Sequence, residues 1–370
     1  MSAAVRLREL SFQRFRNLVD ARVSVDAPFV VLCGRNGEGK TNTLEAAHLL
    51  ATLKPLRGRR VRELIRWGER SSAVSGRVAL HGIEQELSVT LDAEGRGALL
   101  DDRKVNDLAD YFARVRAVSF TPADAEIVTG EPGRRRNWLD RAAFTARPAH
   151  LDQVRALRRV LDQKAALLRT ERPDPTFLDV LDDQLASLGG ALVQRRQDML
   201  DELMPHVREL HDGIAAGRGD LTLTLQTHAK GESAAERVAA LRDKLGAVRE
   251  REIERRTTLA GPQVDDVRAT LDGKAARDFA SRGQVRSIVL ALKLAEMVAA
   301  RERGTIPMFL LDDVSSELDA ERTGRLVRHV SELGAQVLAT TTDPGPVQAA
   351  LPITDTLVVT VEAGALAVGP

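Results

Sequence analysis

The segment GRNGEGKT, residues 34–41, has the residue types and the spacing that bind a phosphate. It fits the pattern G-x-x-x-x-G-K-[ST], follows the apolar run FVVLC (29–33) and overlaps the start of a stretch with helical periodicity, TNTLEAAHLLATL (41–53). In a strand–loop–helix of this kind the glycines let backbone N–H groups point at phosphate oxygens, the lysine contacts the β- and γ-phosphates, and the hydroxyl binds Mg²⁺. We therefore predict a nucleotide site that includes Lys40 and Thr41.

Two adjacent aspartates, Asp312 and Asp313, end the apolar run FLL (309–311). An acid at the end of a buried strand organises Mg²⁺ in phosphate-loop ATPases, so we expect Asp312 to hold the metal through water. Asp313 is placed to polarise the attacking water, and because it is shorter than a glutamate we expect slow hydrolysis. Lys40 and Asp312 are 272 positions apart, which predicts a large insert between the two halves of the site.

A third motif, SRGQ (281–284), lies 31 positions before Asp312, and SSELD (315–319) follows the two aspartates. Taken alone, SRGQ also fits an ordinary serine-capped helix. In this order and at these spacings, however, the motifs have the layout of the ABC-type ATPases. In that class the signature serine and helix N-terminus of one subunit close over the γ-phosphate that the other subunit holds.

The elements around these motifs predict an α/β protein. The segments SAVSGRVAL (72–80) and QELSVTLDAEG (85–95) alternate like antiparallel strands, whereas helical periodicity dominates from about 133 to 215. We predict an ABC-type P-loop ATPase head, with a mixed sheet flanked by helices, formed by residues 1–125 and 261–370. Residues 126–260 would form a compact, mostly helical second lobe, too short for a long coiled coil.

The composition fits a two-lobed protein that can bury a core, since 43% of the 370 residues are hydrophobic. The net charge is only +1, so an acidic partner must be met by a local patch. The stretch 54–70 carries seven positive and two negative residues, and 131–147 has a net charge of +3.

Aromatic residues make up 3% of the chain, which favours contact with a duplex backbone over stacking on single-stranded bases. The single cysteine, Cys33, and the absence of a long apolar run lead us to expect a cytoplasmic protein.

Taken together, these motifs resemble those of the RecF family of bacterial recombination mediators, which are related to the SMC ATPases. The similar stretches are FRN (15–17), GRNGEGKTNTLEA (34–46), Arg57, GEPGRRRNWLD (130–140), GPQVDD (261–266), SRGQ and LLDDVSSELD (310–319). The resemblance covers the chain from about residue 5 to residue 345. It implies a protein that dimerises on binding ATP and Mg²⁺, binds double-stranded DNA and junctions of single and double strands, and is a weak DNA-dependent ATPase. It also implies that the partners RecR and RecO act with it to load RecA at single-strand gaps.

The resemblance also implies roles for individual residues, by motif match. Lys40, Asp312 and Asp313 would be catalytic, and Thr41 and Asp312 would hold Mg²⁺. Ser281, Gly283 and Gln284 would reach the nucleotide of the partner subunit, and Asp319 would lie at the dimer seam. The residues expected at the ATP of their own subunit are Gly34, Arg35, Asn36, Gly37, Glu38, Gly39, Lys40, Thr41, Arg16 and Arg57.

Three features depart from the family pattern. Gln263 and Val264 replace a basic pair, and VLATTTDPGP (337–346) offers threonines and Asp343 where many ABC ATPases have a switch histidine. The glutamine that usually marks the entry to the second lobe has no clear counterpart, and Asp124 is the nearest polar residue. A nucleotide-binding subunit of a membrane transporter is an alternative, although the missing histidine and glutamine and an insert larger than such a subunit needs count against it. A metabolic P-loop kinase is another, although it leaves SRGQ and SSELD without a role.

Overall fold

The computed structural model describes residues 2–58, 60–215, 219–314, 320–349 and 355–369. Two compact units are present: unit 1 is Met1–Asp124 with Leu290–Pro370, and unit 2 is Ala125–Val289. The first boundary lies one residue from the predicted one. The second differs from the prediction, because residues 261–289 lie in unit 2, where the strand at 266–271 pairs with the strand at 221–226. Asp319, expected at the dimer seam, lies outside the described residues.

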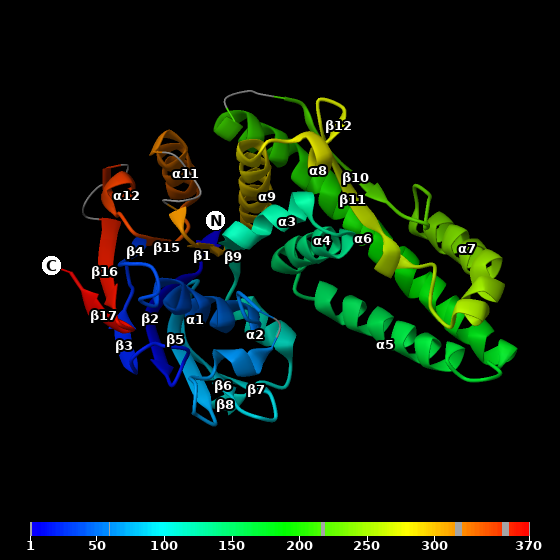
Figure 1. Cartoon of the computed structure of the whole chain (residues 1–370), viewed down its shortest axis with the longest axis horizontal. Coiled ribbons are helices and arrows are strands. Elements are labelled where there is room, and N and C mark those ends of the chain that lie inside the picture. Colours follow the sequence, from blue (N-terminus) through cyan, green and yellow to red (C-terminus); the bar gives the residue numbers. More distant parts are fainter. Residues whose placement is uncertain (1, 59, 216–218, 315–319, 350–354, 370) are drawn as a thin grey trace. The chain divides into compact units, whose positions relative to one another are not determined.

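The main sheet of unit 1 is six-stranded, and only its edge strand β17 runs antiparallel to its neighbour (Figure 1). In spatial order the strands are β17 (Ala365–Val368), β16 (Thr356–Glu362), β4 (Phe29–Cys33), β15 (Val337–Thr341), β14 (Met308–Leu311) and β9 (Ala117–Phe120). Because β4, β15 and β14 are parallel neighbours, their carboxyl ends meet at one edge of the sheet. The phosphate loop, Thr340 and Asp312 all lie at that edge.

A second six-stranded sheet of unit 1 is antiparallel throughout, as the alternating segments predicted. Its order is β3 (Ala21–Ser24), β2 (Arg6–Gln13), β5 (Ser72–Leu80), β6 (Ile83–Leu91), β7 (Arg96–Leu100) and β8 (Arg103–Lys104). Helix α1 (Lys40–Thr52) contacts strands of both sheets, and its residues 43–51 are all buried. A helix that is buried on every side has fixed neighbours all round, so its first turn is held firmly at the site.

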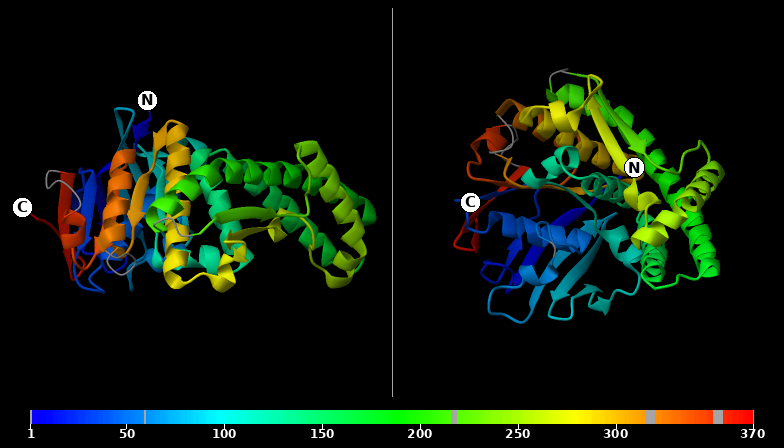
Figure 2. Two further views of the ribbon diagram at one scale, coloured as in Figure 1. Left: turned by 90° about the horizontal axis from the view of Figure 1, so that it is seen from above. Right: turned by 45° about the vertical axis from the view of Figure 1, so that its right-hand side comes forward.

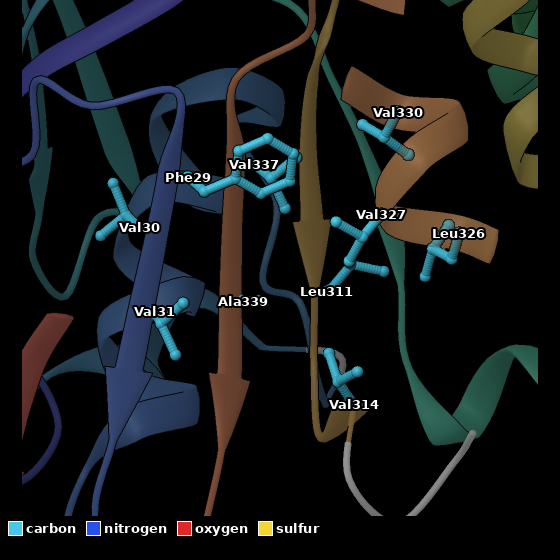
Figure 3. Close-up of a pocket in the computed structure, with 10 residues that line it drawn as sticks. All are labelled: Phe29, Val30, Val31, Leu311, Val314, Leu326, Val327, Val330, Val337 and Ala339. Carbon is cyan, nitrogen blue, oxygen red and sulfur yellow. The ribbon is translucent and has the colours of Figure 1, made fainter. Parts of the chain in front are cut away.

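Helix α11 (Ala320–Leu333) packs against β4, β14 and β15 (Figure 3). Leu326, Val327 and Val330 of the helix meet Val31, Leu311 and other apolar side chains of the strands around a cavity of about 10 Å³. A space of this size with an apolar lining is a packing gap in the core and not a ligand site.

The remaining elements of unit 1 are short. They are β1 (Ala3–Ala4), which pairs with β13 (Thr305–Ile306), the 3₁₀ turns η1 (Val61–Leu64) and η2 (Pro122–Ala125), α2 (Leu108–Arg114) and α12 (Gly345–Ala349). Helix α9 (Arg282–Glu302) begins in unit 2 and continues into unit 1.

Unit 2 is mostly helical, as predicted. Its helices are α3 (Glu126–Thr129), α4 (Pro132–Ala146), α5 (His150–Leu168), α6 (Pro175–Ala215), α7 (Ala234–Arg255) and α8 (Ala276–Phe279), with the 3₁₀ turn η3 (Pro262–Val264). A small antiparallel sheet joins β10 (Leu221–Gln226), β11 (Asp266–Leu271) and β12 (Lys274–Ala275). The 41-residue helix α6, green in Figure 2, packs against α4, α5, α7 and β10, and it is the longest described helix. None of the described helices extends as a long coiled coil, and none has an apolar stretch that could cross a lipid bilayer.

Candidate nucleotide site

The phosphate loop joins β4 to α1 in a conformation that depends on glycine. Gly37 has φ +89° and Gly39 has φ +116°, values that other residues rarely adopt. Helix α1 begins at Lys40 with no side-chain cap and no acidic residue in its first turn. The amide groups of that turn therefore lack a side-chain acceptor, which makes the helix start a place for an anion.

Lys40 lies folded onto the loop that precedes it. Its ammonium group donates hydrogen bonds to the carbonyl oxygens of Gly34, at 2.6 Å, and Arg35, at 2.8 Å, and the residue is only 8% exposed. These two carbonyls hold a positive charge over the centre of the loop. A phosphate in the loop would meet that charge directly.

A cavity of about 490 Å³ opens beside the loop, and all of its lining residues belong to unit 1. Eight of them were predicted from the sequence: Asn36, Gly37, Gly39, Lys40, Thr41, Arg57, Asp312 and Asp313. Five were not predicted as ligands: Asn42, Thr121, Pro122, Ala123 and Thr340. Gly34, Arg35, Glu38 and Arg16 were predicted at the ATP but are not among the lining residues.

The metal side of the cavity is built around Asp312, which two threonine hydroxyl groups contact. Asp312 accepts hydrogen bonds from the hydroxyl groups of Thr41, at 2.8 Å, and Thr340, at 2.9 Å. The backbone N–H of Asp313 donates to the same Thr340 hydroxyl at 2.7 Å. Burial raises the pKa of the Asp312 carboxyl above its usual value, and the hydrogen bonds from the two hydroxyl groups to the charged form offset only part of that rise. Thr340 therefore positions both aspartates, and it lies in the segment 337–346, where many ABC ATPases have a switch histidine.

These oxygen groups fit Mg²⁺. The hydroxyl of Thr41 and the carboxylate of Asp312 are hard oxygen ligands within hydrogen-bond distance of each other, and Mg²⁺ in nucleotide sites takes one or two protein oxygens with phosphate oxygens and water. Bound there, the ion would neutralise phosphate charge.

Glu45 of α1 organises both arginines that were expected near the nucleotide. Its side chain is fully buried and pairs with the Arg16 guanidinium at 2.9 Å. Its other carboxylate oxygen accepts the backbone N–H groups of Leu56 and Arg57, both at 3.1 Å. The Arg57 side chain then donates to Asn42 at 2.8 Å and lines the cavity, whereas the charge of Arg16 is directed to Glu45. The acid within TNTLEA was the only sequence signal for this arrangement.

The signature segment begins α9 in unit 2. Gln284 Oε1 accepts from the Ser281 backbone N–H at 2.8 Å, and Ser281 Oγ accepts from the Gln284 backbone N–H at 3.3 Å. This reciprocal pair is a helix capping box. Ser281 is exposed, and Gly283 and Gln284 are half-buried. The local geometry thus fits an ordinary capped helix and also leaves the helix start open to a ligand from outside.

Two residues that the sequence suggested as substitutes for switch residues have structural partners instead. The carboxylate of Asp124 accepts from the Thr121 backbone and side chain and pairs with Lys293 at 3.1 Å, while its neighbours Thr121–Ala123 line the cavity. Asp343 accepts from the Gly345 backbone N–H at 2.9 Å within its own turn.

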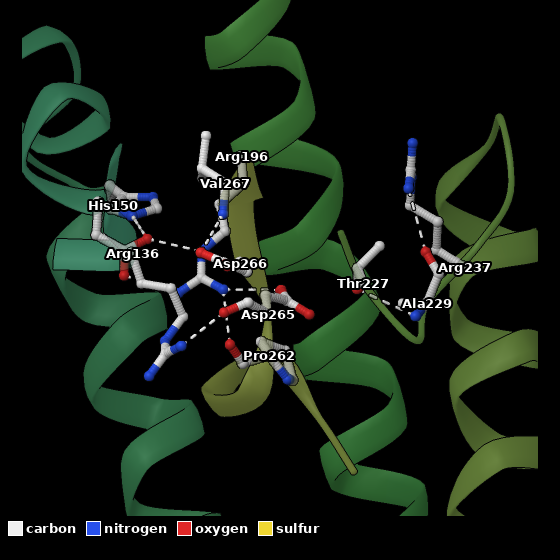
Figure 4. A network of polar contacts seen from close by, with 11 residues as sticks. Arg136, His150, Arg196, Thr227, Ala229, Arg237, Pro262, Asp265, Asp266 and Val267 are labelled. Atoms are coloured by element: carbon white, nitrogen blue, oxygen red, sulfur yellow. Dashed lines mark hydrogen bonds and ion pairs between the residues drawn. The ribbon is translucent and has the colours of Figure 1, made fainter. Parts of the chain in front are cut away.

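The GPQVDD segment forms a buried ionic network in unit 2 (Figure 4). Arg196 of α6 pairs with Asp265 at 2.9 Å and with Asp140 at 2.8 Å, and Arg135 pairs with Asp266 at 2.6 Å. Burial raises the pKa of Asp265 to about 6. Burial also acts on Asp140, but the hydrogen bonds from Arg196 and His150 outweigh it and lower that pKa to about 2. These ion pairs connect α4, α6 and the start of β11 within unit 2.

Two arginines of the stretch 131–147 take part in the same network. Arg135 is buried against Asp266, and Arg136 donates to the backbone carbonyl of Asp265 at 2.6 Å. Arg134 pairs with Glu126 at 2.7 Å. The structure thus uses much of this basic stretch for internal contacts, so it is a poor candidate for a phosphate-binding face.

The comparisons with known proteins agree with the sequence motifs. A family model described as RecF/RecN/SMC N terminal domain matches residues 6–364. A curated protein of Myxococcus xanthus named DNA replication and repair protein RecF is 41% identical, with 98% of this chain and 97% of the relative covered. The chain belongs to the RecF family. A relative of the same name from Geobacter sulfurreducens is 38% identical over 91% of this chain and 93% of its own length.

Solved structures show the same fold. The structure described as the recombination mediator protein RecF-ATPrS in RecFOR pathway has a TM-score of 0.89 at 24% identity, with all of both chains covered. An SMC head bound to the C-winged helix domain of ScpA has a TM-score of 0.58 at 14% identity, with 98% of this chain and 96% of the other covered. The predicted RecF resemblance and the ABC-type, SMC-like ATPase fold are both confirmed.

Proposed function

We propose that this protein is an ATP-dependent DNA-binding switch of recombinational DNA repair. ATP and Mg²⁺ bind in the cavity of unit 1, two chains close on the nucleotide, and the closed dimer binds double-stranded DNA. Slow hydrolysis, with Asp313 polarising the attacking water, reopens the dimer and releases the DNA. RecR and RecO are the partners through which the switch acts on RecA loading at single-strand gaps.

The observation that carries this proposal is the convergence of Lys40, Thr41, Asp312 and Asp313 on one cavity. These residues supply a cation for the phosphates, two oxygen ligands for the metal and an acid for the water. They follow the ends of two strands, β4 and β14, that are far apart in the sequence, and no structural need of the sheet alone would place them together.

Closure in trans is supported by the position of Ser281. Ser281 is exposed at the start of helix α9, so it is accessible to a phosphate held by another chain. An uncapped γ-phosphate in one chain and an open helix N-terminus in another are complementary in charge.

The basic stretch 54–70 is the candidate DNA contact. Arg60, Arg62 and Arg70 are exposed, as is Trp67, which is 100% accessible. Arginine forks bind phosphate oxygens bidentately, so such a surface suits a duplex backbone without sequence readout.

Sedimentation with labelled duplex DNA tests the proposal. It is run with ATP, with ADP and without nucleotide on the wild type and on Ser281→Arg. We expect a DNA-bound dimer with ATP only, and a Ser281→Arg protein that binds ATP as a monomer and does not dimerise. Ser233→Arg is the matched control, because Ser233 also caps an exposed helix start of unit 2 by a reciprocal pair, with Glu236. It loses a similar cap and should still dimerise.

If Ser281→Arg dimerises normally with ATP, Ser281 does not make the proposed contact with the nucleotide of the other chain. If the sedimenting mass and the DNA binding are the same with ATP, with ADP and without nucleotide, the protein is not a nucleotide-dependent switch. The transporter alternative has lost its basis, because the family and its curated members are DNA replication and repair proteins.

A further inference from the structure

The turn between β16 and β17 binds the phosphate loop through hydrogen bonds to one residue, Glu38. The backbone N–H of Ala363 donates to the Glu38 carboxylate, and the backbone N–H of Gly364 donates to the Glu38 carbonyl oxygen at 2.8 Å. Two consecutive amides of the turn thus bind the side chain and the main chain of one loop residue. Because one acceptor is charged, the pair is stronger than two ordinary backbone hydrogen bonds.

The same turn also holds the segment that precedes β3. The Gly364 carbonyl accepts from the Val19 backbone N–H at 2.8 Å. Asn17 in turn donates to the Gly37 carbonyl oxygen of the loop at 3.2 Å. The turn, the loop and the segment 17–19 therefore form a closed ring of hydrogen bonds around Glu38.

Close packing leaves this junction no room for adjustment. A Cβ on Gly364, where φ is +81°, would lie 2.1 Å from the Asn17 carbonyl oxygen. A Cβ on Gly39 would lie 2.8 Å from the Leu18 side chain and 3.6 Å from Gly364 Cα. Glycine at position 364 lets the backbone of the turn approach that of Asn17, and glycine at position 39 lets the loop pass close to the Leu18 side chain.

We infer that the β16–β17 turn pre-shapes the phosphate loop and that Glu38 is a positioning residue. Its carboxylate is bound to Ala363, and Glu38 is not among the residues that line the cavity. A loop held in its binding conformation has less conformational freedom to lose when a phosphate enters, so its affinity is higher. The inference deepens the proposed function, since it rests on the nucleotide site proposed above.

The negative charge of Glu38 makes its two possible roles change the ATP affinity in different directions when the side chain is removed. A carboxylate beside a phosphate site repels the ligand, so removal of a Glu38 that served only as a nearby charge would leave ATP binding unchanged or make it tighter. Removal of a Glu38 that holds the loop must weaken binding. Glu38→Gln keeps an oxygen acceptor for the Ala363 N–H and removes the charge, and it should rescue binding.

The first measurement is the Kd of MgATP for wild type, Glu38→Ala and Glu38→Gln, by fluorescence of a labelled ATP analogue. We expect Glu38→Ala to bind about tenfold more weakly, the loss of one charge-assisted hydrogen bond, and Glu38→Gln to bind as the wild type does or more tightly. An Ala variant that binds as tightly as the wild type would overturn the inference.

Gly364→Ala tests the turn itself, and Gly82→Ala is its control. Gly82 has φ +77° in the turn between β5 and β6, but a Cβ there meets nothing within 4 Å. Both variants bear the same backbone strain, so only the contact with Asn17 differs. Gly364→Ala should weaken MgATP binding about tenfold or more, and Gly82→Ala should leave it unchanged. Equal affinities in the two glycine variants would contradict a role for the turn.

Hydrogen exchange of residues 34–41 without nucleotide separates this inference from the proposed function. Faster exchange in Glu38→Ala and Gly364→Ala, but not in Gly82→Ala, supports the positioning role even if the wild type binds no nucleotide. Unchanged exchange in the loop overturns that role even if the wild type binds ATP well.

Discussion

Thr340 connects the two aspartates of the site, and its replacement by valine should affect both stability and ATP hydrolysis. Thr340→Val removes a hydrogen bond of 2.9 Å to the Asp312 carboxylate and leaves the Asp313 backbone N–H, now bonded at 2.7 Å, without that acceptor. Thr340 is 1% exposed, so water does not replace the lost partner. A bond to a charged group contributes about 1.5–3 kcal/mol and an ordinary hydrogen bond about 0.5–1.5 kcal/mol, so unfolding should become easier by about 2–4 kcal/mol after partial compensation by the new methyl group.

Thr341→Val is the matched control for this variant. Thr341 is the next residue of β15 and is also 1% exposed, and its hydroxyl likewise donates one hydrogen bond and accepts one, both with Asp343. Urea unfolding followed by circular dichroism measures stability, and steady-state turnover at saturating MgATP measures hydrolysis. Both variants should lose stability, but only Thr340→Val should lose ATP turnover, by about 10–100-fold, as is usual when a group that orients a metal ligand is removed. Equal turnover in the two folded variants would refute the assignment of Thr340 as the residue that positions the aspartates.

Other parts of the structure give further predictions. Lys40→Met should abolish MgATP binding and ATP-driven dimerisation, because the charge held over the loop is lost; equilibrium dialysis and sedimentation measure the two effects. Arg196→Met should destabilise the protein by about 3–5 kcal/mol in urea unfolding, since it leaves two buried carboxylates without their partner. The pKa of Asp265 is about 6 when folded and near 4 when unfolded, so the folded state binds its proton more tightly and wild-type stability should fall as the pH rises from 4 to 7. Asp265→Asn should lose this dependence, and parallel stability profiles of the two proteins would contradict it. Arg60→Ala combined with Arg62→Ala should weaken duplex binding and lower its salt dependence, which a salt titration with Arg158→Ala as control would measure.

The sequence predicted those parts of the site that are local in the chain. GRNGEGKT could be recognised because its strand, loop and helix are consecutive, so the pattern alone determines where Lys40 and Thr41 point. FLLDD could be recognised because the apolar strand and the two acids that end it are also consecutive in the chain. The α/β class, the antiparallel segments and the helical second lobe followed from periodicity for the same reason.

What the sequence did not predict depends on contacts between distant segments. Thr340 faces Asp312 only because β14 and β15 are neighbours in a particular register, with Leu311 opposite Ala339. Glu38 matches the phosphate-loop pattern, but its direction is set by a turn 325 positions away. The second domain boundary was placed at GPQVDD because its glycine and proline are typical of a linker between domains. The strand that follows this segment pairs with β10, however, and so belongs to unit 2.

The strand order of the main sheet has a consequence for the synthesis of the protein. The strand β4, which leads into the phosphate loop, lies between β15 and β16, so both of its neighbours come from the last tenth of the chain. Unit 2 is one continuous segment and can fold on the ribosome while the remainder is still being made. The residues of the phosphate loop are among the first to leave the ribosome, but they have no sheet to join until almost the whole chain has followed. A nascent chain that stops short of β15 should therefore carry a folded helical unit and no capacity to bind ATP.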